Sequence, residues 1–179
     1  VALESEPDIK QVFITGVSNE DAPNLERKLY VIRKKIENQV NHKDFYIVSL
    51  SSKNIIYKGM LSSMQVRDYF DDLRDTYFTS GLALVHSRFS TNTFPTWSLA
   101  QPFRLLCHNG EINTVRGNRN WMKARESVLN SGLLGDISSI RPIVQPNMSD
   151  SASLDNVFEF FVMSGLSLPH AMALLVPES

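Results

Sequence analysis

Residues Phe103–Met122, FRLLCHNGEINTVRGNRNWM, decide the fold class because they pass from a strand pattern to a helix pattern through one turn. The first six, 103–108, are mainly apolar and predict a short strand. Asn109-Gly110 is a pair typical of tight turns. Thr114 suits a helix N-cap, and the apolar positions after it predict a helix that ends at Gly132. A strand therefore ends in a polar turn and leads into a helix.

Four other segments have the composition of short strands. They are Gln11–Thr15, Phe45–Leu50, Asn54–Lys58 and Leu82–Phe89. A polar turn is expected between the second and the third. The fourth is apolar on both faces at first, which predicts a central position in a sheet.

Two more helices are predicted, one after the Gln11–Thr15 strand and one near the end of the chain. Asp21 and Pro23 are start signals for the first, which carries Lys34 and Lys35 on its solvent side. The second begins near Ser151 and ends at Gly165. The apolar faces consist of Leu25, Leu29, Ile32 and Ile36 in the first helix and of Val157, Phe158, Phe161 and Val162 in the second. Strands and helices come in blocks rather than in strict alternation, so we expect an α+β layered sandwich.

The composition fits one globular domain. The 179 residues are 42% hydrophobic and 21% charged, and the formal net charge is -1. Such a balance does not favour nucleic acid or an acidic membrane as a partner. Cys107 stands alone, so no internal disulfide is expected, and the longest apolar runs are too short for a membrane helix. The chain starts at Val1 without Met, and we expect residues 1–179 to be one domain truncated at both ends.

Two charged residues lie at the ends of predicted elements, in positions that suit ligand binding. Arg88 lies near the end of the 82–89 strand, where its planar fork could bind a carboxylate. It could equally be a structural arginine bound to loop carbonyls. Asp150, just before the last helix, could take a substrate ammonium or could simply cap the helix.

The Asn109-Gly110 turn adds a third kind of group. An asparagine amide beside a glycine backbone N–H offers two donors that could hold a developing oxyanion. The alternative is an ordinary turn. Together with Arg88 and Asp150, however, the turn completes the set needed to bind an amino acid by its α end and attack its side-chain carbonyl.

Three strings resemble one family. They are HSRFSTNTFPTWSLAQPFR (His86–Arg104), HNGEINTVRGNRNWM (His108–Met122) and SDSASLDN (Ser149–Asn156). They resemble the glutaminase domain of the glutamate synthases, which are class II, N-terminal-nucleophile amidotransferases. The resemblance implies a four-layer αββα sandwich, incomplete in this chain.

The resemblance also implies roles. Arg88 would bind the α-carboxylate of glutamine and Asp150 its α-amine, while Thr91 and Asn92 line the pocket. Asn109 and Gly110 would form the oxyanion hole. The family's nucleophile is an N-terminal cysteine, which this chain does not contain, so the fragment alone is expected to be inactive.

The family further implies a parent enzyme that passes ammonia to 2-oxoglutarate in another domain. FMN and an iron–sulfur cluster are implied there, with none in this fragment. Glutamine, the remaining domains and a small reductase subunit are the implied partners, in the cytoplasm or a plastid. Two rival hypotheses stay open: another class II amidotransferase, and a non-catalytic interaction module.

The remaining polar residues are expected to have structural rather than catalytic or metal-binding roles. Cys107 and His108 alternate along a strand and should face opposite ways, which argues against a Cys-His dyad. His86, His108 and Cys107 have no zinc-like spacing, so no metal site is expected. Arg116, Arg119 and Lys123 form a basic strip, interpreted as a solvated face or a contact to another domain, with RNA binding as a weak rival.

Overall fold

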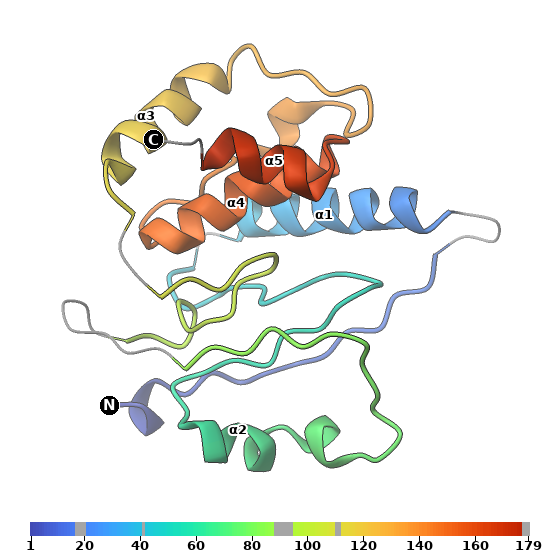
Figure 1. The fold of residues 1–179 in the computed structure, drawn as a ribbon, viewed down its shortest axis with the longest axis vertical. Coiled ribbons are helices and arrows are strands. Elements are labelled where there is room, and N and C mark those ends of the chain that lie inside the picture. The colour runs from blue at the N-terminus through green and yellow to red at the C-terminus, as the bar shows by residue number, and fades with distance from the viewer. Residues whose placement is uncertain (17–20, 41, 88–94, 110–111, 177–179) are drawn as a thin grey trace.

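The computed structural model describes residues 1–16, 21–40, 42–87, 95–109 and 112–176. Five α-helices form there: α1 (Ala22–Gln39), α2 (Ser63–Tyr69), α3 (Val115–Arg125), α4 (Asp150–Met163) and α5 (Leu168–Leu175). Three short 3-10 helices are η1 (Leu3–Ser5), η2 (Asp71–Arg74) and η3 (Ile137–Ile140). Figure 1 shows α1, α3, α4 and α5 on one side of a layer of extended segments and α2 on the other.

Helix α1 begins where the sequence predicts. The Asp21 carboxylate accepts a hydrogen bond from the Asn24 amide at 2.8 Å, as an N-cap should. Pro23 lies in the first turn, where a missing N–H leaves no partner unsatisfied. Farther along, Glu26 accepts hydrogen bonds from the hydroxyls of Ser51 at 2.8 Å and Ser52 at 2.5 Å. The helix is therefore tied to the polar turn predicted after residue 50.

The buried face of α1 differs from the predicted one. Ile32 is 41% exposed, whereas Lys34, expected in solvent, is only 2% exposed. The prediction for Lys34 is wrong because its ammonium has buried partners: Nζ donates to the carbonyls of Pro142 at 2.8 Å and Ile143 at 3.0 Å. Lys35 is exposed, as predicted.

Burial of Lys34 makes the stability of the domain depend on pH. Desolvation lowers the pKa of Lys34 from 10.5 to about 8. Between those values the unfolded chain holds a proton that the folded chain has lost, so the free energy of unfolding rises with pH; below the folded pKa the burial cost is present in full. We expect wild type to gain at most about 1.4 kcal/mol per pH unit over that window relative to Lys34→Met.

Urea unfolding across that pH range measures this gain. Lys35→Met is the matched control, because it changes the exposed neighbour on the same helix. It should keep the wild-type slope of stability against pH. Identical slopes in wild type and Lys34→Met would show that Lys34 stays charged when buried.

Helix α4 is the centre of the packing. It begins at Asp150 after the N-cap Ser149 and ends before Gly165, whose φ of 105° only glycine adopts easily, so both predicted ends are confirmed. Two cores meet on it: Phe160 packs in one and Phe158 in the other. The first core consists of Tyr30, Met122, Leu134, Ile137, Ile140, Ile143 and Phe160. The second consists of Phe103, Leu106, Ala152, Phe158 and Ala171.

The predicted strands are not formed within the described residues. Four of the segments run extended through the middle layer (Figure 1), whereas residues 103–106 of the fifth close a turn, and no backbone hydrogen bond in the described ranges joins one segment to another. In Gln11–Thr15 and in the described part of Leu82–Phe89 the apolar side chains are open to solvent: Phe13 is 90% exposed, and Leu82 and Val85 are 78% and 85% exposed. A strand is stabilised by pairing and by burial on its faces. These segments have the composition of strands without either, and Leu82–Phe89 is not central as far as it is described.

Helix α3 starts where expected but stops early. Thr114 precedes it with a left-handed φ of 60° and makes no side-chain cap bond. The helix ends at Arg125 instead of at Gly132. Among its predicted apolar residues Met122 is buried, while Val128, past the end, is 79% exposed. Leu129, also past the end, is half-buried and packs against the first core without a helix there.

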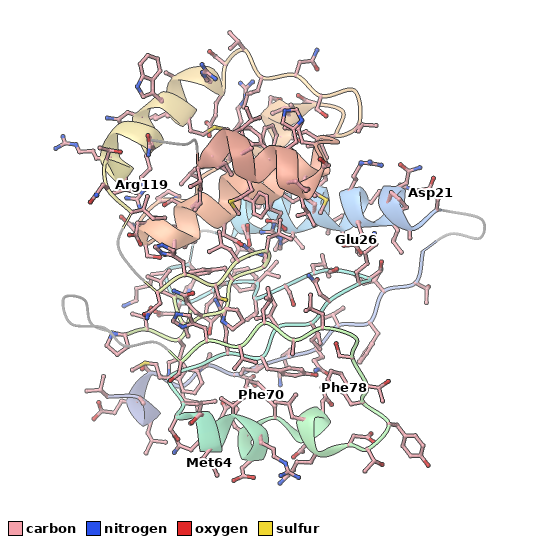
Figure 2. All side chains as sticks on the ribbon, viewed as in Figure 1. Asp21, Glu26, Met64, Phe70, Phe78 and Arg119 are labelled. Atoms are coloured by element: carbon pink, nitrogen blue, oxygen red, sulfur yellow. The ribbon has the colours of Figure 1, made fainter. Side chains whose placement is uncertain are left out.

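The far side of the extended layer is covered by α2. Tyr57, from an extended segment, packs against Phe70 and Phe78, with ring centroids 5.0 and 5.9 Å apart. Figure 2 labels the two phenylalanines. No helix in the described ranges is long and apolar enough to cross a bilayer.

Candidate functional site

The site residues predicted from the sequence divide into two groups. Arg88, Thr91, Asn92 and Gly110 lie outside the described residues. Asn109 and Asp150 lie within them. The described part of the site therefore consists of the Asn109 side of the turn and the start of α4.

Asp150 is bound to the chain just after the turn. Its carboxylate accepts from the Ile112 amide at 2.6 Å and from the Ser151 amide at 2.6 Å. The capping role belongs to Ser149, whose hydroxyl accepts from Ala152 at 3.1 Å. Asp150 thus does more than start a helix: it joins α4 to the residue three positions after Asn109.

The charge of Asp150 is preserved despite partial burial. Burial would raise its pKa, but hydrogen bonds from Ile112 and Ser151 and the nearby His108 outweigh this, so the pKa lies below its ordinary value. A carboxylate has about four acceptor positions, and three donors use part of them. An ionised acceptor with room for another donor remains.

Asn109 follows a short turn that is closed by one backbone hydrogen bond and by the side chain of Gln101. The Phe103 amide donates to the Leu106 carbonyl at 2.9 Å. Two residues farther out on each side, the Gln101 amide group donates to the His108 carbonyl at 2.5 Å and accepts from the His108 amide at 2.7 Å. Asn109 itself is exposed. Its backbone thus leaves a fixed base, and its side chain is open to a ligand.

The same turn is anchored to α4 from beneath. The Leu105 amide donates to Asp155 at 2.8 Å, and the Arg104 guanidinium lies 3.7 Å from that carboxylate and 3.1 Å from Glu37. Asp155 is fully buried, and desolvation raises its pKa despite the nearby arginine. Buried partners on α1 and α4 therefore fix the chain that leads to Asn109.

His108 is engaged with α4 rather than with Cys107. Its Nδ1 lies 3.1 Å from the Ser151 hydroxyl, which donates to Asp150 at 3.3 Å. Cys107 is a half-buried free thiol. In the described part of the chain, no group of three or more His, Cys, Asp or Glu residues could hold a metal ion.

Arg119 corrects the interpretation of the basic strip. Arg116 and Lys123 are exposed, but Arg119 is half-buried (Figure 2 labels it where α3 approaches α4). Its guanidinium donates to the Ser153 hydroxyl at 2.9 Å, to the Ser149 carbonyl at 3.0 Å and to the Met148 carbonyl. Arg119 therefore holds the residues that precede and start α4, including the neighbourhood of Asp150.

Sequence reasoning missed three residues around the site: Gln101, Ser151 and Arg119. Their partners are 7, 43 and 34 residues away. Gln101 precedes Pro102, which has no N–H, and a polar side chain at that point was the one local hint of a substitute bond. Ser151 and Arg119 carried no such signal. The described site has an ionised carboxylate bonded to Ile112 and an exposed asparagine after a fixed turn, groups suited to a ligand with an ammonium and a polar carbonyl.

Comparison with known proteins assigns the chain to a family. The sequence model for class-II glutamine amidotransferases matches residues 1–179. The glutamate synthase [NADPH] large chain of Bacillus subtilis is 55% identical over 183 residues, covering 99% of this chain and 12% of that protein. The glutamate synthase [NADH] of Saccharomyces cerevisiae is 47% identical over 187 residues, covering 100% and 9%.

A plastid protein is similar as well. The chloroplastic ferredoxin-dependent glutamate synthase of Oryza sativa is 45% identical over 183 residues, covering 99% of this chain and 11% of that protein. The chain thus spans about a tenth of the length of these relatives. With a family match over its whole length, the chain belongs to the class-II glutamine amidotransferases.

Proposed function

We propose that this chain is the glutaminase region of a glutamate synthase large subunit and that it helps hydrolyse glutamine to glutamate and ammonia. Family membership and the names of the relatives support this proposal. The structural observation that carries it is the hydrogen bond from the Ile112 amide to Asp150. That bond brings an ionised carboxylate to the turn that begins at Asn109, so one ligand can meet both.

Glutamine would be held by the charges at its α end. Asp150 takes the α-ammonium, and Arg88 takes the α-carboxylate through its guanidinium fork. Thr91 and Asn92 line the same pocket. Glutamine bound in this way presents its side-chain amide toward Asn109.

The hydrolysis would use a nucleophile from outside these residues. We propose a cysteine at the mature N-terminus of the parent protein, activated by its own α-amine. Its thiolate attacks the side-chain carbonyl carbon of glutamine, and Asn109 and Gly110 donate hydrogen bonds to the oxygen that becomes negative. The α-amine, which took the proton of the thiol, gives it to the leaving nitrogen, so ammonia departs and a thioester forms; water then hydrolyses the thioester and releases glutamate. The 179 residues alone should bind without hydrolysing.

The rest of the parent protein would use the ammonia. We propose that another domain aminates 2-oxoglutarate and reduces the product, where FMN and an iron–sulfur cluster would carry electrons from an external donor. The relatives differ in electron donor, being named for NADPH, NADH or ferredoxin. Partners would be the other domains of the large subunit and, for a pyridine-nucleotide enzyme, a small reductase subunit. We further propose that the extended segments pair into the αββα sandwich of N-terminal-nucleophile hydrolases within that protein.

Isotope tracing tests this function in the full-length protein. Glutamine labelled with ¹⁵N at the side-chain amide is supplied with 2-oxoglutarate and a reductant. We expect the label in the α-amino group of one newly made glutamate per glutamine consumed. Label delivered to a different acceptor would identify another class II amidotransferase, and intact glutamine would favour the non-catalytic module.

A further inference from the structure

The side chain of Gln101 occupies a place that backbone groups usually fill. In an antiparallel turn closed by the Phe103–Leu106 hydrogen bond, the next hydrogen-bonded pair outward is 101 and 108. At that pair the Gln101 amide supplies both the donor and the acceptor, at 2.5 and 2.7 Å from the backbone of His108. Two bonds from one planar group fix the direction of His108 as well as its position.

The stretch that follows is held at its other end too. Asp150 accepts from Ile112, and the Ser151 hydroxyl meets the His108 ring. His108, which precedes Asn109, is therefore held by Gln101, and Ile112 is held by Asp150. Gln101 is the clamp nearer to Asn109, because it binds His108, the residue just before Asn109.

We propose that Gln101 is a positioning residue for Asn109 as an oxyanion donor of the glutaminase reaction. This rests on the proposed function. Oxyanion donors act only when they lie within hydrogen-bonding distance of the oxygen in the transition state, and a misplacement near 1 Å can cost about a hundredfold. Without its clamp the turn still forms, but Asn109 no longer has one direction. Gln101 itself touches neither substrate nor nucleophile in this assignment.

The first test is Gln101→Met in the full-length enzyme. Methionine keeps the length and volume but makes neither bond to His108. We expect kcat for glutamine hydrolysis to fall about 10- to 100-fold. The KM for glutamine should stay within about threefold of wild type, because the charged ends of glutamine are bound elsewhere. Glutamate synthesis from free ammonia should be unchanged.

Gln145→Met is the matched control. Gln145 is also a half-buried glutamine whose side chain donates one hydrogen bond, to Asn38 at 2.9 Å, away from the turn. A general packing effect would lower activity and thermal stability in both variants alike. The proposal requires that Gln145→Met keep wild-type kcat.

Gln101→Glu gives a second, independent measurement. Its carboxylate can accept from the His108 amide but repels the His108 carbonyl, and protonation restores an O–H donor. Partial burial and the His108 carbonyl should raise the pKa of the new carboxyl above its usual value of about 4.3. We therefore expect the ratio of variant to wild-type kcat to rise as the pH is lowered from about 8 to about 6. A ratio at or near one at every pH would overturn the proposal, as would a folded Gln101→Met enzyme with normal kcat.

These results can be separated from failure of the proposed function. If Asn109→Asp also keeps normal turnover, the oxyanion assignment itself is wrong. If Asn109→Asp is severely impaired while both Gln101 variants are normal, only the role given to Gln101 is wrong.

Discussion

Full-length enzyme carrying Asp150→Asn should show a KM for glutamine raised about thirtyfold or more, and Arg88→Ala should show a loss of the same order. Each substitution leaves one charged end of bound glutamine without its partner in a closed site, at a cost of roughly 2–5 kcal/mol. Glutamate synthesis from free ammonia should survive in both, because it bypasses the glutamine site. Steady-state kinetics with each nitrogen donor measures the difference.

Asparagine is chosen at position 150 because it separates two roles. Its one side-chain oxygen can still accept from the Ile112 amide, which Asp150 binds at 2.6 Å, but the negative charge is gone and an NH2 group replaces the oxygen that accepts from Ser151. If Asp150 served only to hold Ile112, Asp150→Asn would be nearly normal. A wild-type KM in that variant would therefore remove Asp150 from glutamine binding.

Asp21→Ala is the control for a lost helix-starting aspartate. Asp21 caps α1 through the Asn24 amide, as Asp150 begins α4. Its loss should cost about 1 kcal/mol of stability and leave the KM for glutamine unchanged. A similar rise in KM in both variants would point to general destabilisation.

Local signals carried the predictions that hold. A cap such as Asp21 acts within three residues, and Gly165 ends α4 through its own backbone conformation. Information of that kind lies within a few residues of the element that it defines. The grouping of Asp150 with the Asn109-Gly110 turn could also be anticipated, because an amino-acid ligand needs both a carboxylate for its ammonium and donors for its side-chain carbonyl.

Buried charges could not be predicted from periodicity. Arg33, Lys34 and Glu159 are each less than 10% exposed, although helical patterns place charged residues in solvent. Arg33 and Glu159 form an ion pair across 126 residues, and Lys34 finds its carbonyls 108 and 109 residues away. A buried charge is stable only with such partners, and no window of sequence contains them.

The predicted strands are not formed in the described residues, for a related reason. Composition marks Gln11–Thr15 or Leu82–Phe89 as suited to a sheet, but a strand exists only when another strand completes its hydrogen bonds. In the described residues that completion is absent, and the apolar side chains stay exposed. Helices, whose hydrogen bonds are internal, formed from the same chain without this requirement.

The largest loss of turnover is expected for Asn109→Asp. If Asn109 only shapes the turn, aspartate should be mild, because it favours the same turns. If the amide donates to the oxyanion, aspartate removes the N–H donors and places negative charge where negative charge must develop. Loss of one such donor costs about a hundred- to a thousandfold in kcat, and the added repulsion should move the loss toward the upper end. The KM for glutamine should change far less, since the ground-state carbonyl carries little charge.

Steady-state glutamine hydrolysis by the full-length enzyme measures this loss, with thermal melting as the check on folding. Asn113→Asp supplies the same chemical change four residues away, on an exposed side chain, and should keep normal kcat. The exposed position of Asn109 on its clamped base makes a large structural effect of the substitution unexpected. A folded Asn109→Asp enzyme with near-normal turnover would return Asn109-Gly110 to the status of an ordinary turn, and the role proposed for Gln101 would fall with it.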